Sequence, residues 1–373
     1  MKKFILTSCL SLSFFMPGDI FAQVVTSQQE KFRVETVTDG LSYPWSVAFL
    51  PGGDFLVTER DGKLWRIGKA GKKTEIAGIP EVQAQGQGGL LEIALSPDFK
   101  KDSLIYLSYA GGTRFSFNTE LATARLDLKN HTLSDLKAIF KAEPKISGGN
   151  HFGGKILFLD DGTLLLTLGE RNRKEKAQET DHHLGKIVRL NRDGTVPEDN
   201  PFTGKEGFRP EIYTYGNRNV QGIALQPGTG RIWEHEHGPK GGDEVNILKP
   251  GANYGWPAIT YGVNYTGFKI TDKTEAPGME QPVIHWTPSI APSGMAFYDG
   301  DRFPQWEGDI FVGALAGTHL RRLEVRDDKI TAQEILLADM EERIRDVRTG
   351  PDGYIYLLTD SHDGRLIRLS PAR

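Results

Sequence analysis

One pattern of residues recurs along the 373-residue chain and restricts the folds that it can adopt. Each copy has an apolar strand, a turn rich in Pro, Asp or Gly, a second alternating strand, and a glycine-linked third strand with a basic and apolar end. The intervals between copies run from 46 residues (47 to 93) to 72 residues (223 to 295), and the shortest is close to one four-stranded propeller blade. Equivalent positions in the six copies are Val47, Ile93, Ile156, Ile223, Met295 and Val347.

Turn pairs between the alternating runs, such as Asp161-Gly162 and Asp352-Gly353, are typical of β-hairpins because these residues tolerate positive φ. No segment has a sustained 3.6-residue apolar period, and residues 171–186 are polar enough for a loop or a short surface helix. The sequence therefore predicts an all-β fold, a six-bladed β-propeller in a single domain over residues 23–373. An eight-stranded barrel or a pair of sandwiches is the alternative.

Longer insertions between the repeats predict which face carries function, because loops at one end of a propeller form its channel mouth. These insertions are 108–150, 170–183, 196–216 and 250–292.

Residues 1–22 are typical of an export signal: Lys2 and Lys3 precede an apolar stretch over 4–16, and Ala22 offers a small residue for cleavage. The single cysteine, Cys9, lies inside this leader, so the mature chain has no thiol, which suits an oxidising compartment. We therefore expect a periplasmic or secreted protein. No other stretch is apolar enough for stable membrane insertion.

The balance of 45 Lys and Arg against 49 Asp and Glu gives a formal net charge of −4. Without a basic excess to neutralise phosphates, nucleic acid is excluded as a partner class.

Asn150-His151-Phe152-Gly153-Gly154 lies directly before a predicted strand. The glycines allow a ligand to approach the backbone, and a neutral imidazole there is a candidate general base. A structural, hydrogen-bonding role for His151 is the alternative. At another strand start, residues 215–222 place Arg218 and Asn219 between amides and glycines, so a planar cation beside amide donors could grip a carboxylate or polarise a carbonyl.

Residues 236–256 combine oxygen donors with tight turns, notably Gly238-Pro239, Glu244 and Tyr254. Calcium takes six to eight oxygen ligands, including main-chain carbonyls, so a calcium site is indicated. Zinc at His235 and His237 is the alternative, although no third His or HExxH spacing is nearby.

Arg343 and Arg345 open the last repeat two residues apart. In an extended segment both side chains face the same side, where they could clamp a polyanion. A solvated ladder of charges is the alternative.

Taken together, these motifs resemble the soluble pyrroloquinoline quinone (PQQ)-dependent aldose sugar dehydrogenases, relatives of soluble quinoprotein glucose dehydrogenase. They run in order from about residue 40 to the C-terminus. The segments that carry the resemblance are 87–91 (QGGLL), 150–154 (NHFGG), 215–222 (YGNRNVQG), 236–239 (EHGP), 253–257 (NYGWP) and 343–346 (RIRD).

The resemblance implies a six-bladed propeller that holds PQQ and Ca²⁺ at the channel mouth, oxidises C1 of pyranose sugars to lactones by hydride transfer to the quinone, and passes electrons to an external acceptor (a periplasmic cytochrome, a quinone or a dye). His151 matches the catalytic base, and Arg218 a second catalytic group. One calcium ion would be held by the turn at Gly238 and Pro239, and a second, structural one by Glu244 and Tyr254. The positions that match cofactor-binding residues are Gln87, Arg218, Asn219, Tyr265, Ala316, Arg343 and Arg345.

Two departures distinguish this chain from the glucose dehydrogenase branch. Asn150 stands where that branch has an acidic residue, so His151 must be oriented by another group. Residues 313–320 (GALAGTHL) contain no lysine where that branch has one on the cofactor. Both favour the aldose sugar dehydrogenase branch. The competing functions are a calcium-dependent lactonase and a non-enzymatic propeller that binds sugar or protein.

Overall fold

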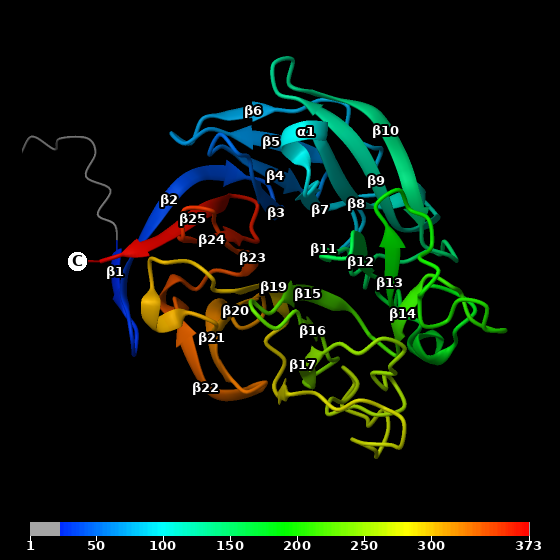
Figure 1. Ribbon diagram of the computed structural model, residues 1–373. Helices are drawn as coiled ribbons and strands as arrows, with labels where there is room; N and C mark the ends of the chain where they lie inside the picture. Colours follow the sequence, from blue (N-terminus) through cyan, green and yellow to red (C-terminus); the bar gives the residue numbers. More distant parts are fainter. Residues whose placement is uncertain (1–22, 373) are drawn as a thin grey trace, which may run out of the picture.

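The computed structural model describes residues 23–372, which form six antiparallel sheets arranged like blades around a central axis (Figure 1). The predicted six-bladed β-propeller is therefore confirmed. The first three blades contain β3 (Pro44–Phe49), β4 (Phe55–Glu59), β5 (Lys63–Ile67) and β6 (Lys73–Glu75); β7 (Leu90–Leu95), β8 (Leu104–Thr113), β9 (Ser116–Asp127) and β10 (Thr132–Lys141); and β11 (Ile156–Phe158), β12 (Thr163–Thr167), β13 (Lys186–Asn191) and β14 (Ile212–Tyr215).

The ends of the chain close the ring, because β2 pairs with β25 in the sixth blade. The remaining blades contain β15 (Val220–Leu225), β16 (Ile232–Glu236), β17 (Asp243–Ile247) and β18 (Ile284–Trp286); β19 (Pro292–Phe297), β20 (Ile310–Ala314), β21 (His319–Arg326) and β22 (Lys329–Leu336); and β23 (Ile344–Thr349), β24 (Ile355–Thr359), β25 (Gly364–Pro371), β2 (Lys31–Leu41) and β1 (Gln23–Thr26).

Helical structure among the described residues is limited to single turns. These are α1 (Phe99–Asp102), η1 (Lys174–Gln178), η2 (Pro304–Trp306) and η3 (Ala338–Met340). The turn η1 falls in the segment predicted as a loop or short surface helix. None of these helices is long and apolar enough to cross a membrane. The predicted export signal at residues 1–22 lies outside the described residues.

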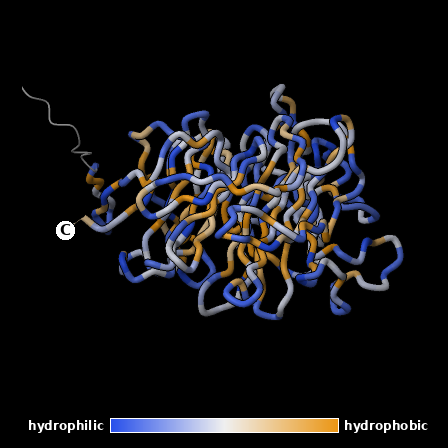
Figure 2. Tube along the Cα trace, turned by 90° about the horizontal axis from the view of Figure 1, so that it is seen from above, coloured by the Kyte–Doolittle hydropathy of each residue, from blue (hydrophilic) through white to orange (hydrophobic). Residues whose placement is uncertain are grey.

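The innermost strands β3, β7, β11, β15, β19 and β23 contact one another around the axis, and they carry all six equivalent repeat positions. The apolar core lies between neighbouring blades rather than at one centre. In one such layer, Leu56 and Leu64 of the first blade pack with Ile105 and Leu107 of the second, all fully buried. Burial of each such leucine stabilises the folded protein by about 1.5–3 kcal/mol relative to an exposed side chain. Figure 2 shows hydrophobic stretches inside the disc and hydrophilic loops on its faces.

One predicted insertion, 108–150, is corrected by the structure. It is mostly strand, because it contains the end of β8 and the whole of β9 and β10. Most residues of β10 are exposed, as expected for the outermost strand of a blade, so the segment lacks the apolar alternation that marks the inner strands.

Five of the six innermost strands carry a β-bulge near their first residues. A bulge inserts one extra residue, re-aims its side chain and frees ladder groups. Hydroxyl groups of the neighbouring blade satisfy the freed carbonyls: Thr58 Oγ1 donates to Leu91 O (2.6 Å), and Thr167 Oγ1 donates to Val220 O (3.2 Å). Through these two bulges the first blade is bound to the second and the third to the fourth.

Candidate active site

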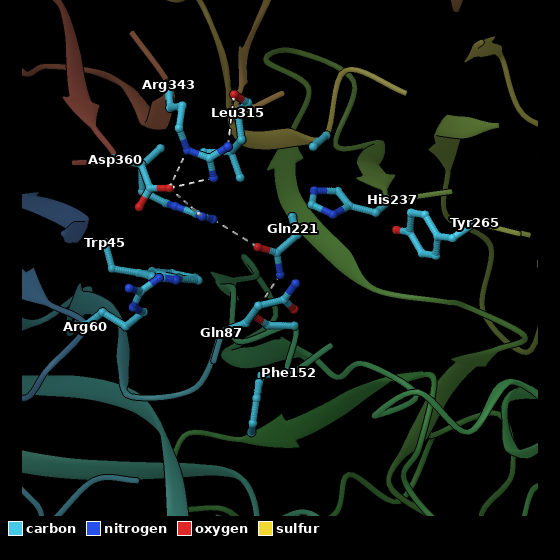
Figure 3. A pocket seen from close by; sticks show the side chains of 13 residues that line it. Trp45, Arg60, Gln87, Phe152, Gln221, His237, Tyr265, Leu315, Arg343 and Asp360 are labelled. Atoms are coloured by element: carbon cyan, nitrogen blue, oxygen red, sulfur yellow. Dashed lines mark hydrogen bonds and ion pairs between the residues drawn. The ribbon is translucent and has the colours of Figure 1, made fainter. Parts of the chain in front are cut away.

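A cavity of ≈ 230 Å³ lies at one end of the axis, where β3, β15 and β23 begin (Figure 3). Three bulge residues, Trp45, Gln221 and Arg345, lie among its walls. The bulges thus turn side chains of three different blades toward one space. The lining residues are Trp45, Arg60, Gln87, Phe152, Gly153, Gln221, His237, Tyr265, Ala291, Leu315, Arg343, Arg345 and Asp360.

Four of the residues predicted to bind a cofactor, Gln87, Tyr265, Arg343 and Arg345, line this cavity. Tyr265 is 69% exposed and stands at the mouth. Ala316 is exposed and is absent from the lining, where its neighbour Leu315 is found instead.

His151 lies beside the cavity in the segment before β11. Its φ of 55° is rare for a residue other than glycine and must be held by surrounding contacts. Its main-chain N–H donates to Oε1 of Gln87 (2.7 Å), and its side chain is buried. The backbone at His151 is therefore fixed next to a wall residue of the cavity.

Glu170 is the group that orients His151. Nδ1 of His151 lies 3.0 Å from Oε1 of Glu170, a close contact that is bent away from ideal alignment. Such catalytic contacts often tighten only when substrate binds. Because Nδ1 is turned toward the carboxylate, Nε2 is the nitrogen available to a substrate. Burial lowers the pKa of His151 below its ordinary 6.5; Glu170 opposes this shift and Arg218 adds to it. The imidazole is thus neutral at pH 7.

Glu170 is absent from the predicted site, although the hairpin register carries a signal for it. Ile156 of β11 faces Leu166 of β12, and continuing this register places residue 170 beside the His151 segment. The buried Arg171, also not predicted, holds the same segment: Nε donates to Asn150 O (2.9 Å), and its guanidinium lies 3.7 Å from the centre of the Phe152 ring.

Arg343 and Arg345 converge on one carboxylate. Nε and Nη2 of Arg343 donate to Oδ2 of Asp360 at 3.0 and 2.8 Å, and Nη2 of Arg345 lies 3.7 Å from the same oxygen. Burial would raise the pKa of Asp360, but the two arginines hold it below its ordinary value. With Arg60, the cavity holds three guanidinium groups against one carboxylate, so its wall is positively charged.

Arg218 and Asn219, which were also predicted to bind a cofactor, are not among the residues that line this cavity. Nη1 of Arg218 donates to the carbonyls of His237 (3.0 Å) and Gly238 (2.9 Å). Oδ1 of Asn219 accepts from Gly153 N (3.1 Å), so Asn219 supports the His151 segment. Glu236 in turn accepts hydrogen bonds from the main-chain N–H groups of both residues.

Gly238, Glu244 and Tyr254 line a second, smaller cavity together with Arg218 and Glu236. Glu236 and Glu244 are directly opposite on β16 and β17, an arrangement that is unfavourable for two charged carboxylates. Burial, together with the neighbouring carboxyl groups, raises the pKa of Glu244. The pair therefore requires protons or a cation. The Tyr254 hydroxyl already bonds Ile247 O and Lys249 N, which leaves its main chain as the group available to a metal.

For the alternative of zinc at His235 and His237, the part of the chain that the structure describes offers no third metal-ligating side chain close to both. His237 Nε2 contacts Pro292 O (2.6 Å), and burial lowers the pKa of both imidazoles. Within residues 23–372 one group of three close metal-ligating side chains is found, and it lies elsewhere, at Glu179, Asp181 and His182.

Charged residues also meet deeper on the axis. Lys155 Nζ lies 3.0 Å from Glu92 Oε2 and 2.9 Å from Asp346 Oδ1, and Arg348 pairs with the same two carboxylates. All four ions are therefore mutually neutralised in the interior.

Comparisons with known proteins identify the family. Residues 41–368 match the sequence model described as Glucose / Sorbosone dehydrogenase. Aldose sugar dehydrogenase YliI of Escherichia coli (strain K12) is 45% identical over 364 residues, which cover 96% of this chain and 98% of that protein. The chain therefore belongs to the glucose/sorbosone dehydrogenase family of sugar oxidoreductases, and the resemblance predicted from its motifs is confirmed.

Solved structures agree with this assignment. A crystal structure of a glucose dehydrogenase is 50% identical, with a TM-score of 0.89 over 91% of this chain and 99% of that chain. The PQQ-bound form of aldose sugar dehydrogenase from Streptomyces coelicolor is 31% identical, with a TM-score of 0.76 over 92% of this chain and 99% of that chain.

Proposed function

We propose that this protein is a PQQ-dependent aldose sugar dehydrogenase that oxidises C1 of pyranose sugars to lactones. The observation that carries the proposal is the meeting of two groups at one cavity: Gln87 with the His151 segment, and the pair Arg343 and Arg345. The relatives support it, because one is named an aldose sugar dehydrogenase and another was solved with PQQ bound.

The cavity fits a planar, anionic quinone. The cavity has an excess of positive charge, and it also has a hydrogen-bond donor that no protein group accepts from, because the buried Nε of Arg345 has no hydrogen-bond partner. A guanidinium in this state is suited to a ligand carboxylate. The bound quinone would accept the two electrons that leave the sugar. Aromatic side chains that could contact its rings are Trp45, Phe152 and Tyr265.

His151 is the base of the proposed reaction. Nε2 would take the proton of the anomeric hydroxyl as the C1–H bond breaks, and Glu170 would stabilise the imidazolium through Nδ1. Arg218 would supply a fixed positive charge nearby, which already influences the pKa of His151.

Calcium is proposed at two positions. Glu244, facing Glu236 across the strands, fits a structural ion because a divalent cation would relieve their repulsion. At the cofactor, the turn Gly238-Pro239 would contribute main-chain carbonyls. There Arg218 already donates to Gly238 O, so an ion would share that oxygen with the guanidinium or displace it.

A calcium-dependent lactonase is disfavoured by the axial charges. Such an enzyme needs carboxylates free to hold an ion on the axis, whereas Glu92 and Asp346 are paired with Lys155 and Arg348.

The test is reconstitution of the purified protein with PQQ and calcium, followed by dye reduction with aldoses. His151→Ala should lose turnover about 10²–10⁴-fold while quinone binding, followed by tryptophan fluorescence, persists. The exposed His285→Ala serves as the matched control. Failure of the wild-type protein to bind quinone would refute the proposed cofactor. Full activity of His151→Ala would show that His151 is not the catalytic base.

We further propose that the protein is exported to the periplasm or secreted and passes electrons to an external acceptor there. The apolar leader and the absence of cysteine after Cys9 support export. N-terminal sequencing of the protein from its native host tests this: a start near Gln23 is expected, and retention of residues 1–22 would contradict it.

A further inference from the structure

Gln221 is the bulge residue of β15 in the cavity wall. It is the extra residue of the bulge in β15, between the pairs Val220–Glu236 and Gly222–His235. It is 8% exposed and lines the cavity. In Figure 3 its side chain lies between Gln87 and the group formed by Arg343 and Asp360.

The two ends of the Gln221 amide bind different parts of the site. Oε1 accepts from Nη1 of Arg345 (3.2 Å), and Nε2 donates to the carbonyl of Gly153 (3.2 Å). This orientation is dictated by the partners, because a guanidinium only donates and a carbonyl only accepts.

Arg345 depends on this contact. Among the described residues, its side chain makes this one hydrogen bond, its Nε has none, and Asp360 is 3.7 Å away. The carboxylate of Asp360 is instead held closely by Arg343. Gln221 is therefore the nearest polar anchor of a buried cation.

The other end fixes the segment that carries the base. Gly153 is held at both main-chain groups, because its N–H donates to Asn219 (3.1 Å) and its carbonyl accepts from Gln221. A side chain at Gly153 would approach Thr167 O to 2.5 Å, and φ is 62°. The segment thus has little freedom to shift around this contact.

We propose that Gln221 is a positioning residue that holds Arg345 ready for an anionic group of the cofactor and ties it to the His151 segment. The inference rests on the proposed function. A neutral amide suits this place because it orients the guanidinium without cancelling its charge, which a carboxylate would do.

The test measures quinone affinity, by fluorescence titration in the presence of calcium, for Gln221→Leu and Gln221→Glu. Loss of the acceptor in Gln221→Leu should weaken binding about tenfold. Gln221→Glu should weaken it further, by about 100-fold, because it also neutralises Arg345. Gln333→Leu is the matched control, since Gln333 accepts from Trp286 and Arg321 on the outer strands.

Thermal unfolding of each apoprotein separates positioning from general damage. A merely structural role predicts that affinity falls in step with the melting temperature, with Leu and Glu alike. Wild-type affinity in Gln221→Leu, or equal affinity of the two variants, overturns the inference; if Gln221→Glu does not fold, Gln221→Leu alone decides. Failure of the wild-type protein to bind quinone would refute the proposed function instead.

Discussion

Glu170→Gln is the substitution that most directly tests the His151 pair. It keeps the size of the side chain and an oxygen near Nδ1, but removes the negative charge 3.0 Å from the imidazole. At this separation and an effective dielectric constant of about 20, a full ion pair would gain about 5 kcal/mol. Replacement by a neutral acceptor should forfeit about 1.5–3 kcal/mol of that, so maximal turnover should fall about 10- to 100-fold.

The pH dependence gives a second, independent readout. Activity requires neutral His151, so its acid limb follows the pKa of this residue. Glu170 raises that pKa against the effect of burial. Removal of the Glu170 charge should therefore move the acid limb to lower pH, because a weaker base stays unprotonated at lower pH. The maximal turnover should fall, because a weaker base accepts the substrate proton less readily.

The assay is dye-linked turnover of reconstituted enzyme at saturating sugar across the acid limb, with the exposed Glu175→Gln as control. Unchanged turnover and an unshifted limb would show that Glu170 does not serve His151. A lower plateau without a shift would indicate general damage to the site.

Two other predictions concern stability. Because burial raises the pKa of Glu236 to about 7 and also raises that of Glu244, the stability from their protonation is present below about pH 4.5 and is lost as pH rises through about 7. Added calcium should therefore raise Tm more at pH 7 than at pH 5, and Glu244→Gln should abolish this gain; a gain that persists in the variant would contradict the site. Thr58→Val leaves the buried carbonyl of Leu91 without its hydroxyl donor and should cost about 1–3 kcal/mol of unfolding free energy; urea titration beside the exposed Thr274→Val measures it, and equal stability of the two would refute the role of the hydroxyl.

The sequence predicted the blades well because their inner strands are short, apolar and separated by glycine turns. Val47 and its five equivalents all fall on strands around the axis. Arg343 and Arg345 also lie on one side, as their spacing indicated, although the carboxylate that they meet there is Asp360 of the protein itself.

The residues that were missed depend on register and on bulges. Glu170 reaches His151 through the pairing of β11 with β12, a relation that emerges only when the hairpin register is extended beyond the ends of both strands. Gln221 and Trp45 face the cavity because an extra residue shifts the strand. A period-two pattern assigns each side chain to a face by counting, so it fails at such insertions.

The pairing of β2 with β25 means that the sixth blade is assembled from both ends of the chain. Arg345 lies on β23 of the same blade, separated from β25 by β24. A chain without β25 can complete neither the ring nor the blade that carries Arg345. Ligand binding should therefore depend on ring closure, even though β25 contributes no residue to the cavity lining.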